Sequence, residues 1–197
     1  MPKERENLVI ISGPSGADKD KVIQGLIDKG IPIERIVTST TRQIRDKETH
    51  GKEYYFISED EMNEMIKNDE MAEHASVYGR INGVTKKELE RVKNLKDKVG
   101  IWPIDEQGAI VMKNQYPNIL TIAISAPPEE LANRVNNRNE ATDSIAQRMQ
   151  SKNEWIGSSK TFEYTVQNKE DKLDNAVKEV LNILKKEGMI DKIAQNS

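Results

Sequence analysis

The chain has no cysteine and no long apolar run. Without cysteine there is neither a disulfide framework nor a thiolate metal site, and a reducing cytosol suits such a chain. The first residues are charged and lead into too few apolar ones for a signal-peptide core, and no later stretch approaches the ~20 residues of a membrane span. The sequence therefore predicts a cytoplasmic protein with no membrane partner.

The chain also has no large excess of positive or negative charge. The 197 residues include 30 basic and 33 acidic ones, for a net charge of −3. General nucleic-acid binders usually carry a basic excess, so we expect no nucleic-acid partner. The length is sufficient for one α/β domain with room for an inserted lobe.

A polar loop between two short apolar stretches is the most informative part of the chain. Residues 38–57 read T-S-T-T-R-Q-I-R-D-K-E-T-H-G-K-E-Y-Y-F-I, with Arg42 and Arg45 three positions apart and Tyr54 near the end. The paired N–H donors of a guanidinium group match the paired oxygens of a phosphate. The loop thus predicts binding of a small phosphorylated molecule, although composition alone also fits a solvated basic loop.

A second phosphate-binding pattern lies near the N-terminus. An apolar run at 8–12 predicts a buried parallel strand, and the following loop reads Gly13-Pro14-Ser15-Gly16-Ala17-Asp18-Lys19-Asp20 before a predicted helix. In a strand–loop–helix unit of this kind, backbone N–H groups surround phosphates and a lysine reaches the terminal ones. The pattern G-x-x-x-x-G-K-[ST] is incomplete, because Asp18 replaces a glycine and Asp20 replaces a hydroxyl residue. Asp18 adds a Cβ and a negative charge beside an anion, whereas the Asp20 carboxylate is a hard oxygen ligand that suits Mg²⁺.

The two segments together resemble the guanylate kinase family. The match in the polar loop covers Thr40-Thr41-Arg42, Arg45, Glu48, Gly51, Tyr54, Phe56 and Ile57, and the order of elements extends it over roughly 8–187. The resemblance implies an α/β fold of the P-loop type, in which helices flank a parallel sheet and a small acceptor-binding lobe and a lid are attached. It divides the single domain into a core (about 1–37, 85–126 and 161–197), a GMP-binding lobe (about 38–84) and a lid (about 127–160).

The resemblance also implies which residues hold the acceptor. The residues expected to bind GMP are Thr38, Arg42, Arg45, Tyr54, Glu73 and Asp105. Glu73 would read guanine, since one carboxylate can accept both the N1–H and the 2-amino hydrogens. It lies in a predicted strand at 71–79, whose hairpin turn we place near Asn82-Gly83. The family usually has a tyrosine where Asn82 stands and a small hydroxyl residue where Val84 stands, so GMP binding is expected to be weaker or different there.

The donor side implies ATP and Mg²⁺. The residues expected to bind the ATP phosphates are Gly13, Ser15, Gly16, Lys19 and Asp20. Asn168 would lie beside the nucleoside of ATP. Pro103 replaces the first acid of the family's acid-x-acid pair and alters the end of a strand at 99–104. Asp20 is therefore the remaining candidate magnesium ligand, and a weak one. Lys19 and three lid arginines, Arg134, Arg138 and Arg148, would stabilise the transferring phosphoryl group.

Three interpretations remain open from the sequence, and one of them is a kinase with a different acceptor or phosphate donor, since a carboxylate-rich P-loop would suit another donor. Retention of Lys19 and the lid arginines favours phosphoryl transfer from ATP to GMP. The alternative is a catalytically weak or inactive relative that binds GMP or a protein partner, because Asp18, Asp20 and Pro103 all fall on the ATP side. Nucleotides are the expected partners of the kinase, and a protein partner belongs only to the alternative.

Overall fold

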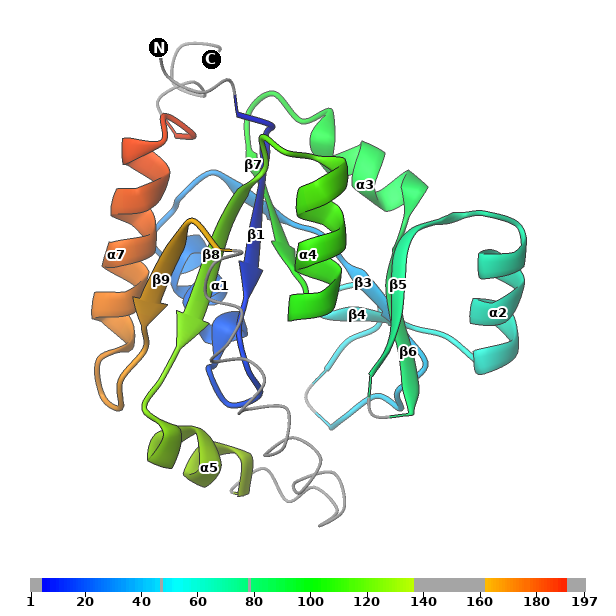
Figure 1. Ribbon diagram of the computed structural model, residues 1–197, viewed down its shortest axis with the longest axis horizontal. Coiled ribbons are helices and arrows are strands. Elements are labelled where there is room, and N and C mark those ends of the chain that lie inside the picture. The colour runs from blue at the N-terminus through cyan, green and yellow to red at the C-terminus, as the bar shows by residue number, and fades with distance from the viewer. Residues whose placement is uncertain (1–4, 47, 78, 137–161, 191–197) are drawn as a thin grey trace.

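A five-stranded parallel sheet forms the centre of the computed structural model, which describes residues 5–46, 48–77, 79–136 and 162–190. The strand order is β2-β7-β1-β8-β9 (Figure 1). The bounds are Leu8–Ser12 for β1, Ile33–Arg35 for β2, Val99–Pro103 for β7, Leu120–Ser125 for β8 and Tyr164–Gln167 for β9. β1 and β7 are buried along their whole length, which explains why they read as continuous apolar runs.

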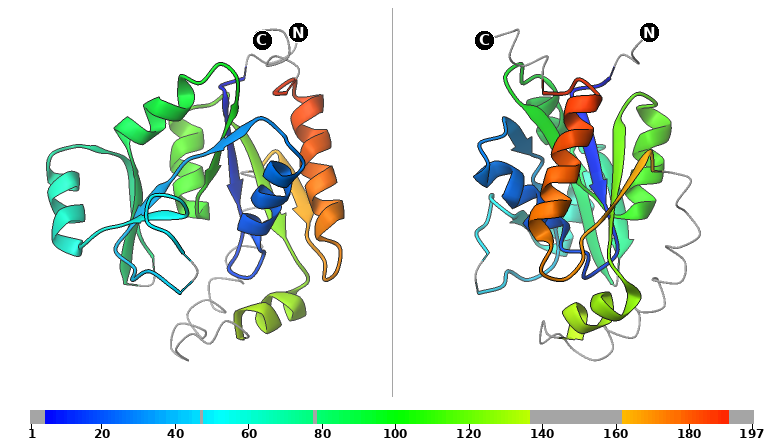
Figure 2. Two further views of the ribbon diagram at one scale, coloured as in Figure 1. Left: turned by 180° about the vertical axis from the view of Figure 1, so that it is seen from behind. Right: turned by 90° about the vertical axis from the view of Figure 1, so that its left-hand side faces the viewer.

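Helices cover both faces of this sheet. α1 (Lys19–Asp28) and α7 (Leu173–Lys186) pack together on one face, while α3 (Lys86–Lys93) and α4 (Glu106–Gln115) lie on the other (Figures 1 and 2). Each face has its own apolar cluster, one built around Val22, Ile23 and Val177 and the other around Trp102 and Met112. α5 (Pro128–Asn136) follows β8 at the carboxyl ends of the strands. The predicted α/β fold with a helix-flanked parallel sheet is confirmed.

A second, four-stranded sheet lies beside the core, within the segment predicted as the acceptor lobe. Its order is β4-β3-β6-β5, with β3–β4 parallel and the other pairs antiparallel. The bounds are Thr38–Thr40 for β3, Tyr54–Phe56 for β4, Met71–Val77 for β5 and Arg80–Thr85 for β6. α2 (Glu59–Lys67) forms the outer side of this lobe (Figure 1).

Local capping patterns fix where two of the helices begin. The Ser58 hydroxyl accepts a hydrogen bond from the backbone N–H of Glu61 at 3.1 Å, and the Thr85 hydroxyl accepts one from Glu88 at 3.1 Å. Both residues occupy the N-cap position, where a side-chain oxygen satisfies an N–H group that has no helical partner. The two segments with Ser or Thr three residues before Glu, 58–61 and 85–88, therefore begin α2 and α3.

The hairpin turn predicted near Asn82-Gly83 is wrong, because both residues lie inside β6 and the connection to β5 falls between Val77 and Arg80. A Cβ on Gly83 would come within 2.5 Å of the Glu73 carbonyl oxygen, so this glycine permits close packing of the strands. Pro103 does not interrupt β7; it is the last residue of the strand.

Candidate functional site

The glycine loop joins β1 to α1 at the carboxyl edge of the core sheet, where open α/β sheets bind ligands. The backbone N–H of Ala17 donates to the Pro14 carbonyl at 3.1 Å and closes a turn. Gly13 lies directly against β8, since a Cβ there would be 2.2 Å from the Ile124 carbonyl oxygen. On the other side, the buried Asn168 donates from Nδ2 to the Ala17 carbonyl at 3.0 Å. The loop is thus held in shape by β8 and by the residue that follows β9, and the role predicted for Asn168 beside the nucleoside stays a prediction.

Asp18 is the N-cap residue of α1 and lies in the left-handed region, with φ 57° and ψ 38°. Glycine adopts this conformation readily, whereas Asp18 adopts it with a Cβ, at the position where the P-loop pattern has glycine. The carboxylate makes no capping hydrogen bond and pairs instead with Lys21 Nζ at 2.8 Å. It therefore does not compete with an anion for the first N–H groups of α1, and Lys21 offsets part of its charge. Lys19 is the first residue of the helix.

Asp20, in the first turn of α1, is paired with a residue that sequence analysis did not identify. Its Oδ1 lies 2.8 Å from Nη2 of Arg35, the last residue of β2. No local pattern joins these positions, so only the folded structure could reveal the pair. Among the described residues, no group of three or more histidine, aspartate or glutamate side chains could hold a metal ion. With Asp20 paired to a guanidinium and Pro103 lacking a carboxylate, these residues do not fit a protein-held Mg²⁺.

Arg134 of α5 reaches the glycine loop. Its Nη1 donates to the Gly16 carbonyl at 3.3 Å, and its Nη2 donates to the Asn168 carbonyl at 3.1 Å and pairs with Glu130 at 2.7 Å. The guanidinium group thereby attaches α5 to the loop that would hold the donor phosphates. The other two predicted lid arginines, Arg138 and Arg148, lie outside the described residues.

In the small lobe, the predicted GMP-phosphate residues gather around Glu48. Arg42 forms a two-pronged ion pair with the Glu48 carboxylate, at 2.7 and 2.8 Å, and the backbone N–H of Arg45 donates to the same carboxylate at 2.9 Å. Burial alone would raise the pKa of Glu48, but the hydrogen bonds from Arg42 and Arg45 lower it. The Arg42 guanidinium carbon also lies 5.3 Å from the ring centre of Tyr54. A phosphate arriving here would compete with Glu48 for the fork of Arg42.

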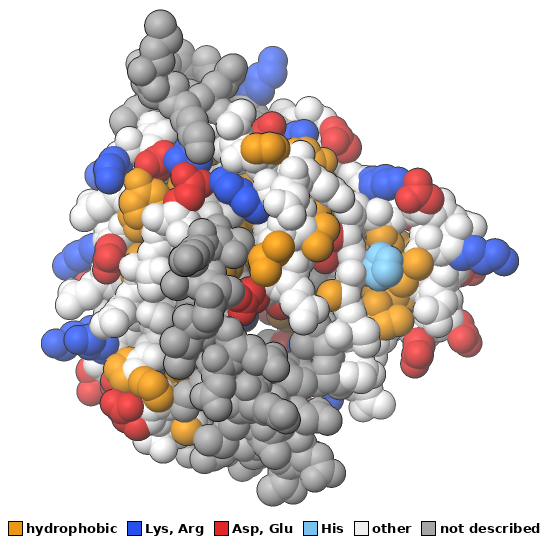
Figure 3. All heavy atoms as spheres, in the orientation of Figure 1, with side chains coloured by type: hydrophobic (Ala, Val, Ile, Leu, Met, Phe, Trp, Pro, Cys, Tyr) orange, Lys and Arg blue, Asp and Glu red, His pale blue; other side chains and the backbone are white. Residues whose placement is uncertain are grey.

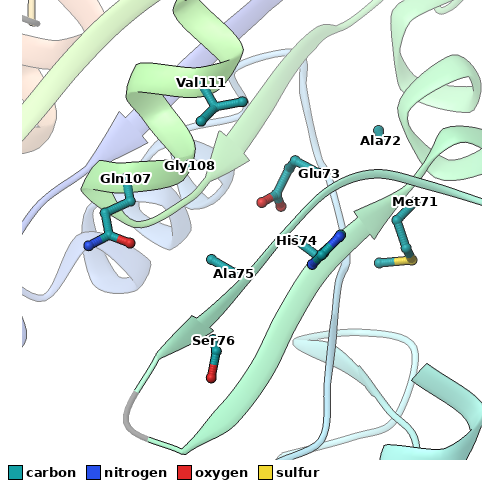
Figure 4. A pocket seen from close by; sticks show the side chains of 9 residues that line it. All are labelled: Met71, Ala72, Glu73, His74, Ala75, Ser76, Gln107, Gly108 and Val111. Carbon is teal, nitrogen blue, oxygen red and sulfur yellow. The ribbon is translucent and has the colours of Figure 1, made fainter. Parts of the chain in front are cut away.

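A cavity of about 440 Å³ opens between β5 and the start of α4. Figure 3 shows the molecule hollowed between the core and the small lobe. The residues that line the cavity are Met71, Ala72, Glu73, His74, Ala75, Ser76, Gln107, Gly108 and Val111. Glu73 points from β5 toward α4 (Figure 4), and a Cβ on Gly108 would be 3.4 Å from its Oε2. The cavity thus has the carboxylate that the sequence predicts for reading guanine.

Burial raises the pKa of the Glu73 carboxyl to about 8, and the nearby charge of Asp105 acts in the same direction, while hydrogen bonding to the backbone of Val84 opposes it. Asp105 is itself occupied as the N-cap of α4, accepting from the Gly108 N–H at 2.9 Å. The cavity is therefore lined by one buried carboxyl group, Glu73, with the charge of Asp105 close by, and this arrangement suits a ligand that brings several N–H donors.

Thr38, which is expected to bind GMP, and the two residues that depart from the family pattern, Asn82 and Val84, all lie in the small sheet. Thr38 is buried at the start of β3, and the Thr40 hydroxyl donates to Asn82 Oδ1 at 2.6 Å. Val84 is fully buried and packs in the apolar cluster that contains Trp102. Both departures from the family pattern thus have structural roles here: Asn82 joins β6 to β3, and Val84 fills the core.

A glycine loop at the carboxyl edge of a parallel sheet, together with a second lobe that carries an arginine–tyrosine cluster and an acidic cavity, defines a P-loop protein of the nucleotide-kinase type. A guanylate kinase family model matches residues 5–187. The guanylate kinases of Caldanaerobacter subterraneus subsp. tengcongensis and Clostridium acetobutylicum are each 36% identical to this chain. The alignments cover 92% and 96% of this chain and 88% and 90% of those proteins. This chain belongs to the guanylate kinase family, whose members are nucleoside monophosphate kinases.

The fold comparison agrees with the family assignment. The crystal structure of guanylate kinase from Anaplasma phagocytophilum matches with a TM-score of 0.70 at 28% identity, covering 91% of this chain and 85% of that one. No helix in the described part of the chain is long and apolar enough to cross a membrane.

Proposed function

We propose that this protein transfers the terminal phosphoryl group of ATP to GMP, giving ADP and GDP. The observation that carries the proposal is the contact between the two phosphate-directed regions. Arg35 pairs with Asp20 of the donor loop at 2.8 Å, and its guanidinium carbon lies 6.0 Å from the ring centre of Tyr54 in the acceptor lobe. A donor held by the loop and an acceptor held by the lobe would therefore meet end to end.

The acceptor would be oriented by its phosphate and its base. Arg42, Arg45 and Tyr54 would bind the GMP phosphate, with Arg42 released from Glu48 as the phosphate takes over its fork. Glu73 would accept the guanine N1–H and 2-amino hydrogens, with Thr38 and Asp105 beside it. Because adenine lacks this pair of donors, it would leave the buried carboxylate unpaired, and selection for guanine follows.

The donor phosphates would lie on Gly13, Ser15 and Gly16 at the start of α1, with Lys19 directed to the terminal ones. Arg134 would hold α5 on this loop through the Gly16 carbonyl, and Arg138 and Arg148 are proposed to add positive charge as the phosphoryl group moves. Catalysis of this kind consists mainly of alignment and charge neutralisation. No residue is assigned to a magnesium ion, for the reason given for Asp20 and Pro103.

The test is formation of ADP from ATP with GMP, AMP, CMP or UMP as acceptor. We expect turnover with GMP alone, and loss of that turnover in Lys19→Ala. Lys29→Ala removes a lysine from the other end of the same helix, where it pairs with Asp174 on the surface, and should behave as the unchanged protein does. Turnover that persists in Lys19→Ala, or that is equal for all four acceptors, would contradict the proposal.

A second candidate, a GMP-binding protein without turnover, is favoured by the left-handed Asp18 and by the Asp20–Arg35 pair in the donor loop. It predicts that GMP binds in a calorimetric titration while ADP formation is absent. In that case, activity that appears in Asp18→Gly/Asp20→Thr would locate the loss in the donor loop alone.

A further inference from the structure

Arg35 lies where the core sheet meets the small lobe. It is the last residue of β2, an edge strand of the core, and β3 of the lobe follows shortly after it. Its guanidinium contacts Asp20 on one side and faces the Tyr54 ring, while Arg42 lies 5.3 Å from the centre of the same ring. Two arginines from different parts of the molecule thus converge on the tyrosine expected at the acceptor phosphate.

The Arg35 side chain is largely enclosed. Only 16% of it is exposed, against 54% of the Asp20 side chain, and its Nε is buried with no hydrogen-bond partner. A guanidinium carries five N–H donors in a fixed fork, and a buried donor without a partner is costly. The side chain is therefore held in place by Asp20 with donor capacity left for a ligand.

At position 20, an ion pair between Asp20 and Arg35 stands where the P-loop pattern has a hydroxyl residue. In the P-loop pattern, the residue after the lysine supplies a hydroxyl to the magnesium ion that accompanies the nucleotide. Here that residue is a carboxylate bound to a guanidinium. The Arg35 guanidinium, with its parallel N–H donors, suits a pair of phosphate oxygens, and because Asp20 balances its charge, it would act by directed hydrogen bonds rather than by a net positive charge.

We propose that Arg35 binds phosphate where donor and acceptor meet, and that the Asp20–Arg35 pair takes the place of the magnesium-bound hydroxyl of the P-loop. Asp20 is then a positioning residue that holds the guanidinium. This inference rests on the proposed function, because it assigns Arg35 to the phosphates of ATP and GMP.

The test is a double-mutant cycle on binding of a dinucleotide in which adenosine and guanosine are joined by five phosphates, measured by calorimetry with EDTA. Arg35→Met should weaken binding ~10–100-fold, the amount typical of a lost charge-assisted hydrogen bond. Asp20→Asn keeps the arginine and should stay within about threefold of the unchanged protein, as expected for a neutral hydrogen-bond partner. Arg35→Met/Asp20→Asn should remain weak.

The double variant separates phosphate binding from simple charge compensation. If Arg35 only neutralised Asp20, removing both charges would restore the original affinity, and the proposal would be overturned. Arg35→Lys keeps the charge without the fork and should fall between the two; it also serves if Arg35→Met does not fold. Lys98→Met removes a cation that pairs with Glu34 of the same strand, outside the site, and should leave dinucleotide binding unchanged.

Magnesium provides an independent measurement. We expect Mg²⁺ to tighten dinucleotide binding more in Asp20→Thr/Arg35→Met, where the hydroxyl returns, than in the unchanged protein. An equal or larger effect of Mg²⁺ on the unchanged protein would overturn the replacement of the metal site. GMP-dependent turnover with no effect of Arg35→Met on binding would overturn the Arg35 proposal alone, whereas absence of both turnover and dinucleotide binding would overturn the proposed function as well.

Discussion

At Glu73, the protein keeps a carboxyl group where its charge is poorly solvated. Burial first, and the charge of Asp105 second, raise its pKa to about 8. Without a bound base, the folded protein therefore keeps Glu73 protonated up to a pH of about 8, and the proton would leave as guanine binds, because its N–H donors favour the ionised carboxylate. The associated stability is fully present below the unfolded pKa and is lost as pH rises through the folded pKa.

Glu73→Gln should separate the stability of this site from its use in recognition. The amide has no charge to bury, so the variant should be more stable than the unchanged protein at pH 9, by ~2–4 kcal/mol, and similar to it at pH 5. GMP affinity should fall ~10-fold or more, because an amide presents an N–H group where the base needs an acceptor. Urea unfolding at both pH values and a GMP titration measure the two effects. Glu64→Gln, the same change on the exposed face of α2, should alter neither, and a stability difference independent of pH would contradict the role given to Glu73.

The sequence predicted residues that belong to local patterns and missed one that does not. Arg42, Tyr54 and Glu73 stand in contiguous family motifs, and the structure describes the first two in one cluster and the third in the acidic cavity. Arg35 is the last residue of an ordinary edge strand, and its importance depends on Asp20 lying beside it after folding. Ion pairs between distant elements depend on tertiary packing, which local spacing does not encode.

In the glycine loop and at the start of α1, the residue present suits neither the local backbone conformation nor the expected phosphate ligand. Asp18 has φ 57°, a conformation that costs non-glycine residues of the order of 1 kcal/mol, and its charge would lie near the phosphates of ATP. The sequence predicted both problems from the missing glycine. It did not predict the Lys21 ion pair that compensates part of the charge.

Asp18→Gly should raise ATP affinity ~5-fold, because the change removes a like charge near the phosphates and suits the left-handed backbone. The chain offers a matched control in Asp69→Gly, since Asp69 has φ 58° after α2 and pairs with Lys86 at the surface. That control removes the same charge from the same backbone conformation and should leave ATP affinity unchanged. Equal effects of the two substitutions on ATP binding would show that overall charge, not the position of Asp18, is responsible.

The starts of α2 and α3 depend on local hydrogen bonding and can be read from the sequence. The Ser58 and Thr85 caps follow from residues three positions apart, and the structure contains both. The turn near Gly83 was misplaced because glycine is common both in turns and where two backbones approach closely. Only the packing of β5 on β6 distinguishes these two uses.

At the scale of the whole molecule, an ion pair connects Arg5, near the N-terminus, to Glu187 at the end of α7. The buried Arg5 side chain hydrogen-bonds Glu163 at 2.9 and 3.0 Å and also pairs with Glu187. Burial acts to raise the pKa of both carboxyl groups, but hydrogen bonds lower it: from Arg5 and Lys113 at Glu163, and from Tyr164 and Arg5 at Glu187. Arg5 and Glu187 are also the first and last residues of the family match, so this contact joins the two ends of the matched segment.

Arg5→Met should lower the free energy of unfolding by ~2 kcal/mol at pH 7, because Glu163 and Glu187 would remain close together without the shared cation. Lys113 still faces Glu163 at 2.7 Å, so Glu187 bears most of the loss.

Since both carboxyl groups have folded pKa values below their unfolded ones, their contribution is present above a pH of about 4.5 and disappears as pH falls through the folded values. The difference between Arg5→Met and the unchanged protein, measured by urea unfolding at pH 7 and at an acidic pH, should therefore shrink as the pH falls below the unfolded pKa of about 4.5. Lys178→Met breaks an exposed pair with Asp174 one helical turn away and should cost at most ~0.5 kcal/mol. A loss in Arg5→Met that is the same at both pH values would mean that the side chain stabilises the chain ends by packing and not by charge.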